Sequence, residues 1–231
     1  MELGLLNSRI VQCGLCASDV AVPTAPPAEE LEPPDFDTRP GETMRSTLPH
    51  WVQRCSSCGY CASDITSMNE EAAGMVQTDR YRSLLQDSSL PAKAREFLCY
   101  SLVLDVVDQP GDAGWSALHA AWACDDADDD ASAIRCRTLA INLWQKCKQA
   151  GESFGDDLTL EFTIVTDVYR RMGAWEEAVV ACSEALDTEE LTPLFEDILR
   201  QEKALIDRKD RSAHSLKELP PFRDRFTMEI Q

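Results

Sequence analysis

Four cysteines near the start of the chain occur as two Cys-x-x-Cys pairs. Cys13 and Cys16 form the first pair, and Cys55 and Cys58 form the second. Two thiolates three positions apart can bind one metal ion from a single tight turn, and a tetrahedral zinc ion takes four such ligands. Gly59 follows the second pair directly, where glycine lets the backbone turn back toward the sulfurs. The pattern predicts a zinc site with these four cysteines as ligands.

A fifth cysteine, Cys61, complicates the second pair, because Cys58-Gly-Tyr-Cys61 is itself a Cys-x-x-Cys motif. Cys61 could substitute for one of the four ligands or stay spare. Gly59 marks Cys58 as the end of the turn and favours a spare thiol. A thioredoxin-like redox site would need a βαβ pattern around the motif, which this stretch lacks. A spare Cys61 beside a zinc site could still act as a thiol switch.

The other cysteines have no pairing rule and are expected to be small buried hydrophobes. They are Cys99, Cys124, Cys136, Cys147 and Cys182. A catalytic cysteine would need a histidine partner, and the three histidines are isolated from one another in the sequence. They are His50, His119 and His214. No phosphate-binding loop, dinucleotide fingerprint or hydrolase elbow occurs, so the motifs favour a protein without catalytic activity.

The run Asp125–Asp130 has five aspartates in six positions, a composition that suggests cation binding. An EF-hand loop starting at Asp126 would need glycine at its sixth position and glutamate at its twelfth. Ala131 and Arg137 stand there instead. The acids are therefore predicted to cap the helix that follows, since negative charge is favourable at a helix amino terminus.

Residues 1–68 are predicted to form a zinc-ribbon-like module with short strands. The strands are expected at Ser8–Gln12, Ser18–Pro23 and His50–Arg54, where they enter and leave the cysteine turns. An acidic insert at about 23–49 separates the pairs and holds seven of the chain's twelve prolines. Because proline disrupts helices, the insert is expected to be extended or irregular, and to wrap the surface of the module or be partly mobile.

Residues 69–219 are predicted to be a helical domain, followed by a docked or frayed tail at 220–231. The apolar periodicity predicts helices at Met75–Gln86, Pro91–Val107, Trp115–Cys124, Ala131–Gln149, Leu158–Arg171, Trp175–Leu186 and Glu190–Lys209. The pair at Leu158–Arg171 and Trp175–Leu186 has the residue spacing of a tetratricopeptide repeat. The spacing is set by Phe162, Val165, Tyr169, Gly173, Ala178, Cys182 and Ala185. The predicted fold is therefore mainly α, with antiparallel helix pairs after the small β module.

The charge balance excludes one class of partner. With 22 basic and 41 acidic residues the formal net charge is -19, which repels phosphate backbones and argues against nucleic-acid binding. No apolar run of about 18 residues predicts a membrane span, and the start of the chain lacks the features of a signal peptide. We therefore expect a cytoplasmic protein that binds neither nucleic acid nor membrane.

The sequence resembles an uncharacterised bacterial family, a domain of unknown function, that joins paired Cys-x-x-Cys motifs to a tetratricopeptide-like half. Three segments carry the likeness: Val11–Cys16, Val52–Tyr60 and Asp167–Ala178. Ser56 stands where such turns often have proline, and Ala17 where the first often has glycine. The resemblance implies metal binding and a cytoplasmic location, and no activity.

These observations lead to two hypotheses of different kinds. The first is a non-catalytic adaptor, in which a structural zinc site fixes the amino-terminal fold and the helix pairs bind a protein partner. The second is a thiol-based redox or metal sensor, in which Cys61 or a ligand thiolate is oxidised and the zinc is released. The sequence names neither the partner nor the oligomeric state.

Overall fold

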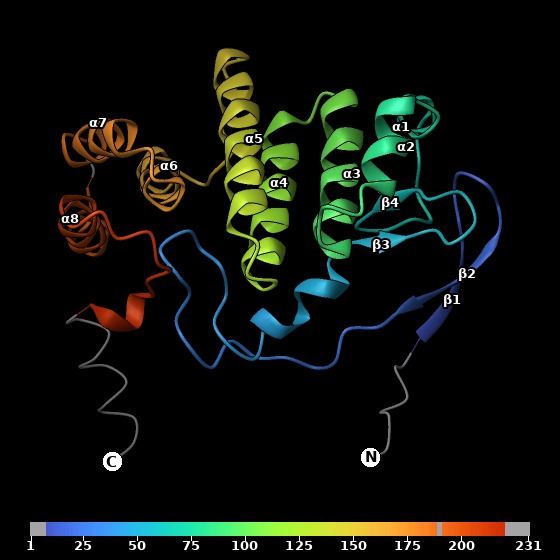
Figure 1. The fold of residues 1–231 in the computed structure, drawn as a ribbon, viewed down its shortest axis with the longest axis horizontal. Helices are drawn as coiled ribbons and strands as arrows, with labels where there is room; N and C mark the ends of the chain where they lie inside the picture. The colour runs from blue at the N-terminus through green and yellow to red at the C-terminus, as the bar shows by residue number, and fades with distance from the viewer. Residues whose placement is uncertain (1–7, 189–190, 220–231) are drawn as a thin grey trace. The chain divides into compact units, whose positions relative to one another are not determined.

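The computed structural model describes residues 8–188 and 191–219, so the predicted tail at 220–231 lies outside the described part of the chain. The fold is mainly α, with short antiparallel strands near the amino end, as predicted (Figure 1). Its internal contacts divide the chain into two compact units. The first comprises Met1–Ala28 and Ser46–Ala150, and the second Glu29–Arg45 and Gly151–Gln231.

Two β-hairpins form the start of the first unit. Strand β1 (Ser8–Gln12) pairs antiparallel with β2 (Asp19–Pro23), and β3 (Gln53–Arg54) pairs with β4 (Cys61–Ala62). The first two strands match the predictions closely. The third is shorter than predicted, because Arg45–His50 forms a 3-10 helix, η1, that takes up His50.

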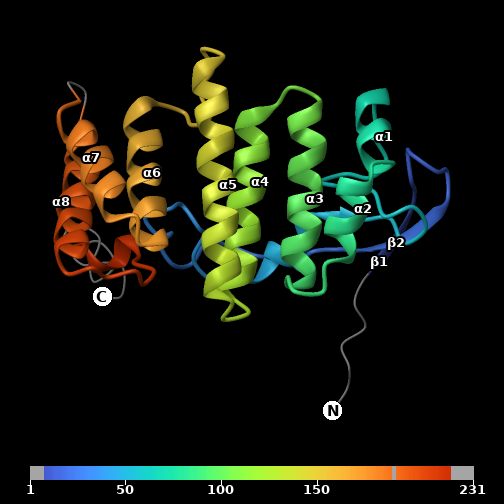
Figure 2. The same ribbon diagram turned by 45° about the horizontal axis from the view of Figure 1, so that its top comes forward.

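In the described part of the first unit, five α-helices follow the hairpins, and α3, α4 and α5 stand side by side (Figures 1 and 2). Their bounds are α1 Glu70–Val76, α2 Asp79–Gln86, α3 Ala92–Val106, α4 Pro110–Asp125 and α5 Asp130–Gln149. Two serine hydroxyls join α3 to α4: Ser101 donates to the Ala113 carbonyl and Ser116 to the Phe97 carbonyl, each at 2.8 Å. Buried alanines along α4 allow this close approach between helices.

Two of the predicted helices were wrong in their bounds. The single helix Met75–Gln86 is instead α1 and α2, because the Thr78 hydroxyl accepts a hydrogen bond from the Tyr81 amide and so begins a new helix. Helix α4 starts at Pro110 rather than at Trp115. Proline fits the first turn of a helix, where its missing N–H costs nothing.

The aspartate run caps a helix, as predicted. The Asp129 carboxylate accepts a hydrogen bond from the Ser132 amide at 3.1 Å and is the N-cap of α5. Asp125 also forms a two-point ion pair with the buried Arg137, with distances of 3.1 and 2.6 Å. The run therefore closes the α4–α5 turn.

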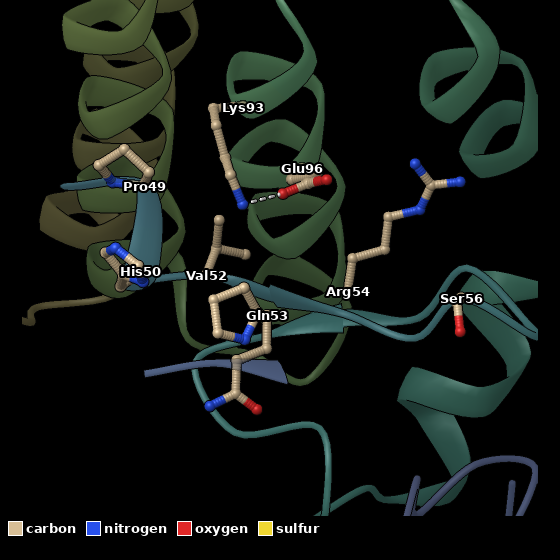
Figure 3. A pocket seen from close by; sticks show the side chains of 9 residues that line it. Pro49, His50, Val52, Gln53, Arg54, Ser56, Lys93 and Glu96 are labelled. Atoms are coloured by element: carbon tan, nitrogen blue, oxygen red, sulfur yellow. Dashed lines mark hydrogen bonds and ion pairs between the residues drawn. The ribbon is translucent and has the colours of Figure 1, made fainter. Parts of the chain in front are cut away.

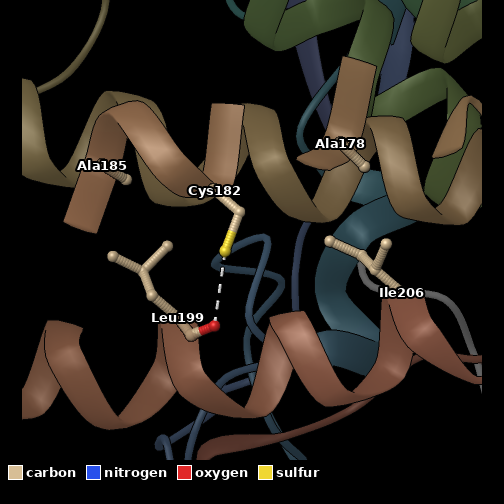
Figure 4. Packing of buried hydrophobic residues seen from close by; sticks show 5 residues of the cluster. All are labelled: Ala178, Cys182, Ala185, Leu199 and Ile206. Carbon is tan, nitrogen blue, oxygen red and sulfur yellow. Dashed lines mark hydrogen bonds between the residues drawn. The ribbon is translucent and has the colours of Figure 1, made fainter. Parts of the chain in front are cut away.

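Among its described residues, the second unit has a body of three α-helices: α6 (Leu158–Met172), α7 (Trp175–Leu186) and α8 (Pro193–Asp207). Gly173 ends α6 in the left-handed conformation, with φ of 77°. The small residues of α7 pack on α8 in a cluster of Ala178, Cys182, Ala185, Leu199 and Ile206 (Figure 4). The predicted helix pair is therefore present, while its identity as a tetratricopeptide repeat stays a prediction.

The central part of the proline-rich insert packs within the second unit, and the expectation that it wraps the metal module was wrong for residues 29–45. Phe36 is buried in a cluster with Ile198 and Leu205 of α8. Asp37, which is fully buried, accepts a hydrogen bond at 3.0 Å from Arg171 of α6. One aromatic ring and one buried ion pair thus fix an otherwise irregular segment.

The compact units therefore divide the chain differently from the ranges 1–68 and 69–219 expected from the sequence. Helices α1 to α5 share a unit with the strands, because α1, α2 and β4 all pack on α3. None of the helices in residues 8–188 and 191–219 has both the length and the apolar character needed to span a bilayer.

Candidate metal centre

The two Cys-x-x-Cys pairs come together in the first unit. The sulfur atoms of Cys13, Cys16, Cys55 and Cys58 all lie within 4.8 Å of one another. The Cys13 and Cys58 sulfurs are 3.8 Å apart, and those of Cys16 and Cys55 are 3.7 Å apart. Each contact joins one pair to the other. The cluster is therefore positioned to bind a metal ion, with two thiols supplied by each hairpin.

These distances fit a tetrahedral thiolate site. A zinc–sulfur bond of about 2.3 Å places the corners of a regular tetrahedron about 3.8 Å apart. Two of the sulfur–sulfur distances, 3.8 and 3.7 Å, match that edge length. The same geometry with four sulfurs also suits iron, so the arrangement defines the coordination but not the metal.

Each cysteine pair occupies the same kind of tight turn between two strands. In the first, the Ala17 amide donates to the Cys13 carbonyl at 2.9 Å. In the second, the Gly59 amide donates to the Cys55 carbonyl at the same distance. Both turns need a left-handed residue at this position, with φ of 56° at Ala17 and 81° at Gly59. Ala17 therefore adopts a glycine-like conformation.

We expect Ala17→Gly to stabilise the metal-bound protein by about 0.5–1 kcal/mol, because glycine adopts a positive φ without the steric cost that alanine bears. The reverse change, Gly59→Ala, should destabilise it, since the new Cβ would lie 2.6 Å from Leu85 Cδ2 as well as at a φ of 81°. The measurement is the chelator concentration that removes half of the metal. It should rise for Ala17→Gly and fall for Gly59→Ala; a fall in both variants would contradict the equivalence of the two turns.

Hydrogen bonds and burial shift the pKa of three of the four thiols, Cys13, Cys16 and Cys58, before any metal binds. Hydrogen bonds from the side chain and the amide of Ser18 lower the pKa of Cys16 to about 6. Burial raises the pKa of Cys13 and that of Cys58. Cys16 is also exposed, whereas Cys13 and Cys55 are buried. Cys16 is thus the thiolate best suited to meet an incoming cation first, and a bound divalent ion favours deprotonation of the others.

Cys61 lies outside the four-sulfur group among the described residues. It is fully buried, and its sulfur is 3.4 Å from the Gly59 carbonyl oxygen. A hydrogen bond with Cys99, together with burial, raises the pKa of Cys61 well above its ordinary value. The Tyr81 hydroxyl accepts from the Cys61 amide at 2.9 Å and donates to the Gly59 carbonyl at 3.0 Å. Cys61 therefore packs against the second cysteine turn, at the carbonyl of Gly59, and is not positioned as a fifth ligand.

Sequence reasoning missed two features of this site. The role of Ser18 had a local signal, because a serine two positions after a metal-binding cysteine can reach back to its sulfur. The contact between Cys61 and Cys99 had none, since it depends on how α3 packs on β4. The three histidines do not join the four-sulfur cluster.

Comparisons of the chain with models of protein families, with curated proteins and with solved structures found no match. The interpretation of the site therefore depends on its own geometry.

Proposed function

We propose that this protein binds one zinc ion through Cys13, Cys16, Cys55 and Cys58, and that the ion has a structural role. The observation that carries the proposal is the pair of sulfur–sulfur distances at the edge length of a zinc–thiolate tetrahedron. Four protein ligands leave no coordination position for a substrate, which is typical of structural sites and not of catalytic ones.

The ion would join two short hairpins. Strands β1 and β2 contain only five residues each, and β3 and β4 only two each. Hairpins this short are marginal on their own in water. A zinc ion that crosslinks Cys16 to Cys55, 39 positions apart, would supply stability that the strands lack.

The metal content of the purified protein tests this proposal. We expect one zinc per chain when the protein is produced with zinc and iron both in supply. After replacement by cobalt, the strong visible absorption of tetrahedral thiolate cobalt should appear with the same stoichiometry. Bound iron would overturn zinc as the native metal, and no metal of either kind would overturn the site.

We further propose that the zinc-stabilised chain acts as a cytoplasmic adaptor for a protein partner. The support is an apolar pair on α7: Val179 and Val180 are 50% and 57% exposed. Exposed β-branched residues contribute little to helix stability, so their presence favours a contact surface. None of the ten cysteines, all of which lie in the described ranges, forms a disulfide, as suits a reducing compartment such as the cytoplasm. Membership of the resembled family remains part of this proposal.

A photo-crosslinking amino acid at position 180 tests the adaptor role in cells. A defined crosslinked protein should appear with the probe at Val180. It should not appear with the probe at Arg200, an exposed and charged position on α8 of the same unit. Equal products at both positions, or none at either, would contradict an adaptor surface on α7.

One observation favours the alternative, a metal or redox sensor. Cys16 is exposed, and its hydrogen bonds with Ser18 lower its pKa to about 6, so its thiolate is available to oxidants when the metal is absent. Cys61 is fully buried with a raised pKa and does not suit that role. If the protein is a sensor, mild peroxide should release the zinc, and a thiol reductant should restore zinc binding. Zinc that stays bound through this treatment supports the structural site.

A further inference from the structure

A pocket of about 420 Å³ lies in the first unit, between the β3 segment and the first turns of α3 (Figure 3). Its volume is that of a small-molecule site. The lining residues are Pro23, Pro49, His50, Val52, Gln53, Arg54, Ser56, Lys93 and Glu96. We call it the Lys93 pocket. It is distinct from the sulfur cluster, whose four cysteines are not among its lining residues.

The charge of the Lys93 pocket is opposite to that of the chain. Arg54 and Lys93 carry two positive charges against one negative charge from Glu96, in a protein with a formal net charge of -19. The Lys93 ammonium donates one hydrogen bond to Glu96, at 2.6 Å, and keeps two further N–H donors (Figure 3). Within the described ranges no side chain pairs with the Arg54 guanidinium. The pocket therefore has unused donors with positive charge.

One buried polar atom at the pocket wall also lacks a partner. The Nδ1 atom of His50 is buried without a hydrogen bond to any described residue. A buried polar atom without a partner is rare in folded proteins and calls for a water molecule or a ligand group. The rest of the wall combines Val52 and the rings of Pro23 and Pro49, which are apolar, with the polar side chains of Gln53 and Ser56. Apolar walls with a few convergent polar groups are typical of binding sites for small organic molecules.

We propose that the Lys93 pocket binds a small organic anion. Arg54 and Lys93 would hold its carboxylate or phosphate group, and the prolines and Val52 would cover an apolar body. Guanidinium groups bind both kinds of oxyanion with two parallel hydrogen bonds, so the shared chemistry is the oxyanion. This inference goes beyond the proposed metal site and adaptor role, and it does not depend on either.

A ligand-observed NMR titration of the zinc-loaded full-length chain tests the proposal with three probes of similar shape. Phenyl phosphate and benzoate carry the two candidate anions on an aromatic ring, and benzamide is the neutral control. We expect at least one anion to saturate a single site, with benzamide at least tenfold weaker. The tighter of the two anions identifies the head group. Failure of both anions to saturate, or equal binding of benzamide, would overturn the proposal.

Single substitutions then assign the site. Arg54→Ala and Lys93→Ala should each weaken the anion about tenfold, the effect of one charge-assisted hydrogen bond worth about 1.4 kcal/mol. Glu96→Gln should tighten it, because this change removes the competing carboxylate and frees Lys93. Arg82→Ala is the matched control, since Arg82 lies on α2 and is not among the lining residues. Weaker binding in Glu96→Gln, or equal losses in Arg82→Ala and Lys93→Ala, would refute the assignment.

Zinc content is measured in each variant alongside anion binding. Arg54 precedes the metal-binding Cys55, so a loss of zinc in Arg54→Ala would disqualify that variant and leave Lys93→Ala as the test. If anion binding fails while zinc is retained, the pocket proposal is wrong and the metal site stands. If zinc is absent while anion binding is retained, the metal site is wrong and the pocket proposal stands. Failure of this inference is thereby distinguished from failure of the metal site.

Discussion

Replacing Cys55 with serine should abolish metal binding and leave most of the helical circular dichroism signal intact. Cys55 is fully buried, its sulfur is 3.7 Å from that of Cys16, and the Cys58 amide donates to it at 3.5 Å. Serine cannot replace a thiolate ligand, so zinc affinity should fall by several orders of magnitude. Helices α3 to α5 bury their own apolar faces against one another and should persist.

Cys182→Ser is the matched control for that substitution. Cys182 is likewise buried, but it lies on α7 and its sulfur donates to the Leu199 carbonyl at 3.5 Å. This variant should retain one zinc per chain. Metal content and hydrogen exchange of the two hairpins report the result. If Cys55→Ser lost its helical signal entirely, the metal site and the helices would be one cooperative unit.

The second large effect is expected at Arg170, whose fully buried guanidinium forms a network within the second unit. It donates to Asp167 at 2.5 Å and to Glu202 at 2.7 Å. It also donates to the carbonyls of Asp210 and Ser212, at 2.7 and 2.9 Å. Arg170→Met would leave two buried carboxylates without their cation. We expect the free energy of unfolding to fall by about 3–5 kcal/mol, the typical cost of breaking a buried ion pair from one side.

The pH dependence of this loss follows from Glu202. Burial, and then the nearby Asp167, raise the pKa of Glu202 well above its ordinary value of 4.5. A carboxyl group with a raised pKa in the folded state is most favourable at low pH, and its contribution is lost as the pH rises above the unfolded value. Without the cation at position 170, the pKa of Glu202 should rise further. The deficit of Arg170→Met should therefore grow as the pH rises above the folded-state pKa of Glu202 in the unmodified protein, which itself lies well above 4.5.

Arg200→Met is the control for Arg170→Met. Arg200 pairs with Glu196 on the exposed face of α8, so its loss should cost less than about 1 kcal/mol. Hydrogen exchange of α6 and α8 peptides at several pH values measures both variants within the second unit. Equal losses in the two variants, or a deficit in Arg170→Met that shrinks as the pH rises, would contradict the role assigned to the network.

The features that sequence reasoning predicted well depend on neighbours in the chain. Strand β1 and helix α7 have the predicted bounds, because alternation, helical periodicity and the turn at Gly173 are local signals. The four clustered cysteines were also found from local spacing, since each pair supplies half of the site from one turn. Thr78 was the missed local signal: a capping threonine within the predicted amphipathic helix Met75–Gln86 splits it into two helices.

The features that could not be predicted depend on contacts between distant residues. Nothing in the acidic, proline-rich composition of the insert indicates that Asp37 pairs with Arg171, which is 134 positions away. The Lys93 pocket likewise combines residues of β2, η1, β3 and α3. A single sequence gives charge and composition at such positions but not the partner, because the partner is fixed only by the packing of whole elements.

The place of residues 29–45 has a consequence for biosynthesis. The ribosome releases the amino end first, so both cysteine pairs emerge while most of the helices are still unmade. Zinc could then tie Cys16 to Cys55 and turn the intervening stretch into a closed loop. Phe36 and Asp37 lie in that loop, and they would have no packing partners until Leu205 and Arg171 are translated much later. A nascent chain stalled before α6 therefore presents this stretch, with its aromatic ring, to chaperones and proteases.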